Sequence, residues 1–124
     1  MHNTQLHHRL DAYRVALALF AEVERIAGAF PRGHADLKDQ IRRAAAATVR
    51  HIAKKGASRM HPKDKAARFS VARGECAECS ASLDMAEVTE IIRRDDAIRL
   101  RRLAFRVSRM LQGLIRRQRA RADE

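Results

Sequence analysis

Apolar side chains recur along this chain at steps of three and four residues, the spacing that puts them on one face of an α-helix. Clusters of proline and glycine interrupt this pattern near residues 31–33 and 56–62. Asp95 and Asp96 are placed to begin a last helix, because acidic side chains complement the positive N-terminus of the helix dipole. The pattern predicts four helices, over residues 10–29, 36–56, 62–92 and 95–120, with Asp36 as the N-cap of the second.

Each of the last three predicted helices has one apolar face and one charged face. The third carries the most regular pattern, because its apolar positions alternate steps of three and four in the manner of a helix-bundle seam. Short connections between long helices favour antiparallel neighbours. We therefore expect an all-α protein in which residues 10–120 form an up-down-up-down four-helix bundle, with a flexible N-terminus at 1–9 and a tail at 121–124. The seam of the third helix comprises Phe69, Ala72, Cys76, Cys79, Leu83 and Ala86.

The first predicted helix differs from the others because it is apolar on two nearly opposite sides. One stripe consists of Leu6, Leu10, Tyr13, Leu17 and Phe20. In a four-helix monomer this helix has only one side covered by its own chain, so a second apolar side indicates a subunit interface or another partner. We assign the interface of a homo-oligomer to the second stripe, which comprises Val15, Leu19, Val23, Ile26 and Phe30.

Composition supports a single helical domain. The chain has 124 residues, of which 46% are hydrophobic, with one tyrosine and no tryptophan. Helix-forming Ala, Leu, Arg and Glu are abundant, whereas strand-forming residues are sparse. No apolar run approaches the ~20 residues of a membrane span, and the polar start lacks the apolar stretch of a secretory signal. We expect a soluble cytoplasmic protein that does not bind membranes.

The two cysteines form a C-x-x-C motif, Cys76 to Cys79, a pattern that zinc sites and thiol redox centres also use. A structural zinc site needs two further ligands at suitable spacing, and a redox pair normally lies at a helix N-terminus. These cysteines lie instead on the apolar seam of a long helix, so we interpret them as core residues. The histidines lie at the chain start, near turns or, for His51, beside lysines. They predict no metal site and no cofactor.

Catalytic patterns are absent from the sequence. It contains no glycine-rich phosphate loop and no nucleophile motif. The carboxylates occupy positions at which amphipathic helices ordinarily carry i,i+3 and i,i+4 ion pairs, although Glu78 lies beside the cysteine seam and could be partly buried against an arginine. We therefore expect no enzymatic activity.

Basic residues dominate the charge of the chain and are concentrated in its last third. The sequence has 26 Lys and Arg against 15 Asp and Glu, a net charge of +11, and eleven arginines against four acidic residues in 91–124 supply +7 of it. Such a field attracts polyanions and is screened by salt. A solvated face of an arginine-rich chain would show the same composition. If the basic stripes bind nucleic acid, the candidate residues are Arg43, Arg50 and Lys54 on the second helix and Arg99, Arg102, Arg106, Arg109 and Arg116 on the fourth.

Phosphate contact is the binding mode that these residues favour. The aromatic residues lie mostly on apolar stripes, so a base-stacking platform for single strands is not expected. No zinc-finger, RNA-recognition or helix-turn-helix pattern is present. Binding would depend on backbone shape and salt, with weak sequence preference.

Several short motifs, in order along the chain, resemble the family of ribosomal-RNA intervening-sequence proteins. Phe30-Pro31 resembles the proline that ends the family's first helix, and residues 40–44 read Q-I-R-R-A, as in its second helix. Residues 72–78 resemble its A-R-G-S-x-x-E segment, and residues 110–115 match its closing M-L-x-G-L-I. The likeness spans about residues 10–117, and the order and separations of the motifs make the set fairly specific.

The resemblance implies an up-down-up-down bundle that assembles as a ring-shaped homopentamer without known enzymatic activity. A related branch, the accessory variability determinants of diversity-generating retroelements, comprises basic pentamers that bind a reverse transcriptase and nucleic acid, and it shares the M-L-x-G segment. The chain departs from the family where N-I-A-E-G becomes H-I-A-K-K at residues 51–55, and where Glu75 replaces a serine. The family roles of those positions are therefore not transferred.

Together these patterns predict a non-enzymatic bacterial bundle protein that forms a homo-oligomer, with a pentamer expected, and docks on RNA or DNA phosphate through basic stripes. The alternative is a protein-interaction adaptor, such as an accessory protein whose ring holds a reverse transcriptase. A location beside a reverse transcriptase gene favours the adaptor. A location inside a ribosomal-RNA gene favours the intervening-sequence protein.

Overall fold

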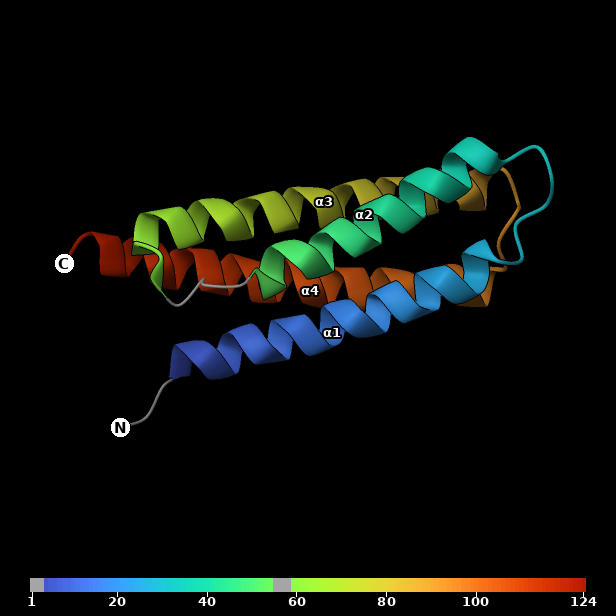
Figure 1. Cartoon of the computed structure of the whole chain (residues 1–124). Helices are drawn as coiled ribbons and strands as arrows, with labels where there is room; N and C mark the ends of the chain where they lie inside the picture. Colours follow the sequence, from blue (N-terminus) through green and yellow to red (C-terminus); the bar gives the residue numbers. More distant parts are fainter. Residues whose placement is uncertain (1–3, 55–58) are drawn as a thin grey trace.

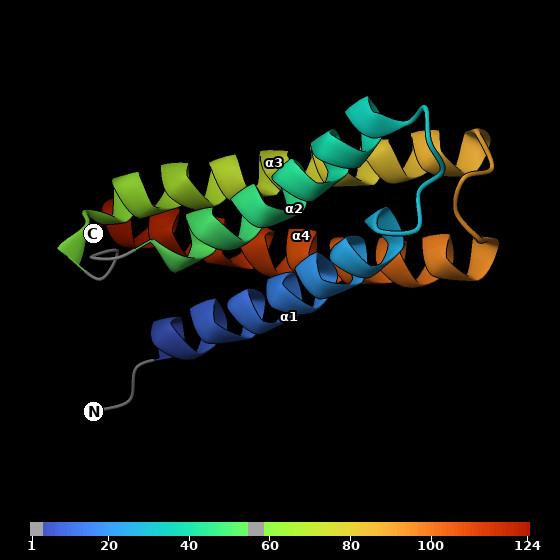
Figure 2. The same cartoon turned by 45° about the vertical axis from the view of Figure 1, so that its right-hand side comes forward.

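A computed structural model describes residues 4–54 and 59–124, which form helices α1 (Thr4–Ala27), α2 (Ala35–Ala53), α3 (Pro62–Val88) and α4 (Arg94–Ala122). The helices run alternately up and down the bundle (Figure 1), and the α1–α2 and α3–α4 connections lie together at one end (Figure 2). α1 packs against α2 and α4, and α3 packs against the same two helices. α2 and α4 therefore lie on a diagonal of the bundle. The predicted all-α four-helix fold is confirmed.

The first two helices begin earlier than predicted. α1 already includes Thr4, so residues 4–9 belong to the helix instead of preceding it. α2 follows His34, because Gly33 turns the chain directly before it with a φ of 96°. Asp36 therefore lies in the first turn of α2 instead of at its N-cap. The predicted end of this helix, Gly56, lies outside the described residues.

The third helix begins as predicted but ends early. α3 starts at Pro62, and the His61 side chain caps it by accepting a hydrogen bond from the Lys63 N–H at 3.1 Å. It ends at Val88, four residues before the expected end at Ile92. The helix stops there because Glu90 adopts a left-handed backbone, with a φ of 60°. α4 has its two aspartates in the first turn, as predicted, and continues two residues into the expected C-terminal tail.

The core is built from one face of each helix. All six residues of the predicted α3 seam are at most 3% exposed, which confirms that seam. All of them except Ala86 belong to one buried cluster with apolar residues of α2 and α4, including the fully buried Ile41, Leu100 and Leu111. Within the described residues, no helix combines the length and the apolar character needed to cross a membrane.

The structure reverses the predicted assignment of the two apolar stripes on α1. Leu19 and Val23 of the stripe assigned to a subunit interface are fully buried, and Phe30 packs against the core. That interface assignment is wrong, because these side chains are used within one chain. The misassigned residues, all in the core or packed against it, are Val15, Leu19, Val23, Ile26 and Phe30.

Small neighbours explain why this stripe faces inward. Ala12, Ala16 and Ala27 are at most 1% exposed and border the stripe. Because alanine is small, α1 can lie close to α2 and α4 along this side. The other stripe remains on the outer side of α1, and its exposed members are Leu6 (41%), Leu10 (37%) and Leu17 (38%).

Candidate nucleic-acid interface

The outer side of α4 carries a line of exposed arginines. Arg102, Arg106, Arg109 and Arg116 recur at steps of three, four and seven residues, so they share one side of the helix. The buried residues of α4 occupy the opposite side, which fixes this side toward solvent. In the part of the chain that the structure describes, none of the four pairs with a carboxylate. Their charges are therefore available to an external anion.

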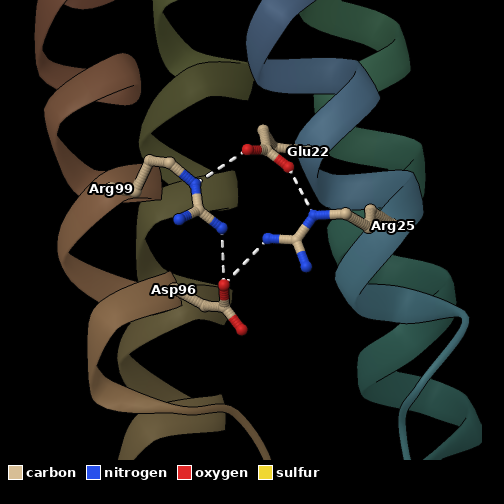
Figure 3. Close-up of polar contacts among 4 residues, drawn as sticks. All are labelled: Glu22, Arg25, Asp96 and Arg99. Atoms are coloured by element: carbon tan, nitrogen blue, oxygen red, sulfur yellow. Dashed lines mark hydrogen bonds and ion pairs between the residues drawn. The ribbon is translucent and has the colours of Figure 1, made fainter.

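Arg99 was predicted as a further member of this line, but it belongs to a closed network between α1 and α4 (Figure 3). Its Nε forms an ion pair with Glu22 Oε1 at 2.7 Å, and its Nη2 donates to Asp96 Oδ1. Arg25 donates to Glu22 Oε2 at 2.7 Å and to Asp96 Oδ1 at 2.8 Å. The pKa of the Glu22 carboxyl group and that of the Asp96 carboxyl group are both lowered, and the hydrogen bonds from Arg25 are the largest cause. Arg99 therefore links two helices, and we remove it from the candidate phosphate ligands.

Two other arginines are committed to helix contacts in the same way. Arg101 donates to Asp84 Oδ1 at 2.7 Å and also pairs with Glu87, which ties α4 to α3. Arg42 donates to Glu24 Oε1 at 3.0 Å, which ties α2 to α1. These partners raise the pKa of both guanidinium groups. The ion pairs thus distinguish arginines that hold the bundle together from Arg102, Arg106, Arg109 and Arg116, which have no carboxylate partner among the described residues.

The second predicted group of basic residues lies on α2. Arg43 and Arg50 are exposed on the side of α2 opposite its buried face, and the exposed Lys54 follows directly as the C-cap of the helix. Because α2 and α4 are diagonal, and each helix turns its core face inward, the two basic groups point to opposite sides of the molecule. The structure therefore does not bring the predicted residues together into one binding surface.

Acidic neighbours further distinguish the α2 group. Arg43 and Gln40 line a cavity of about 370 Å³ between α2 and α3, together with Glu75, Glu78 and Ser82. Burial raises the pKa of Glu75, and the neighbouring Glu78 raises it further. Glu78, which was expected to be partly buried beside the cysteine seam, is exposed. The partly buried carboxylate at this place is Glu75. Nearby negative charge weakens the attraction of Arg43 for phosphate. The α4 line is the stronger candidate surface.

The C-x-x-C motif lies in the core, as predicted. Cys76 and Cys79 are free thiols that are 1% and 0% exposed, and the Cys76 thiol donates to the Ala104 carbonyl oxygen at 3.4 Å. Burial raises the pKa of Cys76 to about 11 and that of Cys79 to about 12. Both therefore stay protonated at neutral pH, the less reactive form. No group of three or more His, Cys, Asp or Glu side chains is placed to hold a metal ion within residues 4–54 and 59–124.

Sequence reasoning missed one member of the α4 surface. Phe105 is 63% exposed, whereas Phe69 is 3% exposed and lies in the core. The Arg109 guanidinium carbon lies 5.7 Å from the centre of the Phe105 ring, within the range of a cation–π contact. The helical spacing could have predicted this exposure, because Phe105 falls outside the apolar arc of α4.

The family model of the 23S rRNA-intervening sequence protein matches residues 8–113. The match includes nearly all of α1, the whole of α2 and α3, and α4 as far as Gly113. A comparison with curated proteins finds no match.

Proposed function

Because this chain belongs to the family of 23S rRNA-intervening sequence proteins, we propose that it is a non-enzymatic protein that binds RNA through the outer face of α4. The observation that carries the proposal is a line of exposed arginines for which residues 4–54 and 59–124 offer no carboxylate partner: Arg102, Arg106, Arg109 and Arg116. The family description names 23S rRNA, which makes RNA the first nucleic acid to test.

The chemistry of the line suits a phosphate backbone. A guanidinium group presents two parallel N–H donors to a phosphate, so each arginine can both neutralise and orient it. Contacts of this kind position the protein without reading base identity. The surface therefore supports binding that follows backbone shape and charge, with weak sequence preference and a strong dependence on salt.

The test is the binding of a structured RNA hairpin to the wild-type chain and to the triple variant Arg102→Gln, Arg106→Gln, Arg109→Gln. Each phosphate contact releases condensed counterions, so the wild-type affinity should fall steeply with salt. The triple variant should bind all sequences similarly weakly, and the slope of log affinity against log salt should flatten by up to about 3 units. Fluorescence anisotropy at several salt concentrations measures both quantities.

The matched control removes the same number of charges from the diagonal helix, in the triple variant Arg43→Gln, Arg50→Gln, Lys54→Gln. We expect this control to retain most of the wild-type affinity and salt slope. Equal losses in the two triple variants would show that net charge, and not the α4 line, governs binding. Absence of RNA and DNA binding by folded wild-type protein at about 50 mM salt would reject the proposal.

The outer stripe of α1 supports a second part of the proposal, that the chain assembles into a homo-oligomer. Leu6, Leu10 and Leu17 remain exposed there, and Tyr13 and Phe20 lie partly buried beside them. A row of this kind on a helix that already packs on two neighbours is typical of a contact with another protein. We assign it to further copies of this chain, in the pentamer that the family resemblance implies. A reverse transcriptase held by an adaptor is the alternative occupant.

A further inference from the structure

Phe105 is the aromatic side chain that the fold leaves most open among the described residues. It is 63% exposed on the outer side of α4, whereas Phe69 is buried. Tyr13, Phe20 and Phe30 are partly buried against the core. Exposing so much of a phenyl ring to water opposes the hydrophobic effect. The bundle itself therefore gains little from an aromatic residue at this position.

Arginines surround this ring on its own helix. Arg102 lies three residues before Phe105 and Arg109 four residues after it, which is about 4.5 and 6 Å along the helix axis. The Arg109 guanidinium carbon is 5.7 Å from the ring centre. Neither arginine pairs with a carboxylate in the part of the chain that the structure describes. The exposed ring thus lies within a positively charged surface.

An open groove runs beside the ring, between α3 and α4. Its volume is about 680 Å³, within the ~300–1,000 Å³ of small-molecule sites. Phe105 forms part of its wall, and the ion pair between Arg101 and Asp84 lies within its lining. The rest of the lining is small, so a flat group can approach the ring from this side. The small lining residues include Ala77, Ser80, Ala81, Ala104 and Ser108.

We propose that Phe105 and this groove form a stacking site for an unpaired base of the RNA that the α4 arginines hold. The inference rests on the proposed RNA binding and specifies which form of RNA is bound. Every base has an aromatic face that can stack on a phenyl ring, and the flanking phosphates then lie near Arg102 and Arg109. A fully paired duplex keeps its bases inside its own stack and cannot use the ring. The charge around the ring favours this occupant over an apolar helix of a partner protein.

The chain lacks tryptophan, so the variant Phe105→Trp carries a single tryptophan, whose fluorescence can be excited selectively over that of Tyr13. Binding of a ten-nucleotide single-stranded adenylate RNA should quench this fluorescence, because stacked bases quench tryptophan. A blunt RNA duplex of the same length should not. The control is Met85→Trp, at a position that is 54% exposed and lines the grooves between α2 and α3. Its fluorescence should stay unchanged with both RNAs.

The variant Phe105→Leu measures the contribution of the ring without labelling it. Leucine keeps the apolar bulk but cannot stack, so affinity for the single strand should fall about tenfold while affinity for the duplex stays within about twofold. Phe105→Tyr, which retains a ring, should keep the wild-type preference. Anisotropy with labelled RNA gives these affinities independently of tryptophan.

The possible failures are distinguishable. If the single strand binds by anisotropy but leaves the Phe105→Trp fluorescence unchanged, the stacking site is rejected and the proposed RNA binding stands. If neither RNA binds at about 50 mM salt, both proposals are rejected. If the Phe105→Trp emission is blue-shifted without RNA and changes with protein concentration, another copy of the chain covers the ring. That outcome also overturns the inference.

Discussion

At the scale of single residues, Glu90 decides where α3 ends. Its φ of 60° is the left-handed conformation that glycine adopts most easily. The Ile91 N–H donates to the Ala86 oxygen at 3.0 Å, and the Glu90 N–H donates to the Glu87 oxygen at 3.0 Å. These two bonds form the Schellman motif that closes many helices. A Cβ atom in this conformation crowds the following carbonyl oxygen, so a glutamate here is strained and lowers the stability of the fold.

We expect Glu90→Gly to raise the free energy of unfolding by about 0.5–1 kcal/mol. Glycine removes a strain of about 1–2 kcal/mol, and the greater freedom of the unfolded chain offsets part of this gain. Urea denaturation followed by circular dichroism measures the change. Glu90→Ala keeps the Cβ atom and should show no such gain. An equal gain in both variants would assign the effect to the glutamate side chain instead of the backbone.

Single residues also show what the sequence could reveal about helix ends. Pro62 is recognisable as a helix start, because its missing N–H costs nothing in the first turn. The end of α3 had no comparable signal, since no proline or glycine lies within residues 89–92. A glutamate in the position usually taken by glycine hides a helix end from any pattern of residue types. The expected end at Ile92 was wrong for this reason.

At the scale of helices, ion pairs distinguish the two apolar sides of α1. Glu22 reaches Arg99 on α4, and Glu24 reaches Arg42 on α2. Turning α1 about its axis to bury the other stripe would separate both carboxylates from these partners. The sequence could predict that α1 has two apolar sides, but each stripe has five large side chains at similar spacing. The partners that distinguish them are brought together only by the fold.

We expect the Glu22–Arg25–Asp96–Arg99 network to make stability sensitive to acid. Arg25 lowers the pKa of Glu22 and Asp96 below their ordinary values of 4.5 and 3.8. The network therefore stabilises the fold above those values, and its contribution is lost as the pH falls through the lowered pKa of each group. The variant Glu22→Gln, Asp96→Asn should lose less stability than the wild type between about pH 5 and pH 2. Thermal unfolding across this range measures the difference.

The expected size of this effect is small, because the pairs are partly open to water. Ion pairs of this kind typically contribute at most about 1 kcal/mol each, and salt reduces the contribution. The control variant Asp39→Asn, Glu124→Gln removes two exposed carboxylates elsewhere and should follow the wild-type acid profile. If the network variant follows that profile as well, the ion pairs do not stabilise the contact between α1 and α4.

At the scale of the whole molecule, the outer faces of three helices differ in chemistry. α4 carries arginines and Phe105, α2 carries a second basic group beside Glu75 and Glu78, and α1 carries an apolar stripe. The sequence could predict the charge, the helices and the presence of an unmatched apolar side. It could not predict that the two basic groups point apart, because their separation follows from the diagonal placement of α2 and α4. The sequence also could not predict that Arg99 is excluded from the candidate site, because its partner Glu22 comes from another helix.

Assembly of the chain is the prediction that belongs to this scale. Leu10 and Leu17 are 37% and 38% exposed on the outer stripe of α1, so charge there should leave the bundle intact. We expect Leu10→Glu, Leu17→Glu to yield a folded monomer, because two carboxylates cannot be buried against another copy without partners. By contrast, Leu19→Glu should unfold the chain, because Leu19 is fully buried in its own core.

Sedimentation equilibrium with circular dichroism tests this prediction. Val71→Glu, Met85→Glu is the matched control, since it adds the same charge at exposed apolar positions of α3 that are 47% and 54% exposed. The control should assemble like the wild type, because only the α1 stripe is proposed to lie between copies. A wild-type chain that sediments as a monomer at micromolar concentration would reject the homo-oligomer and leave the apolar stripe to a different protein partner. Loss of assembly in the control as well would show that added charge, and not the α1 stripe, disrupts the contact.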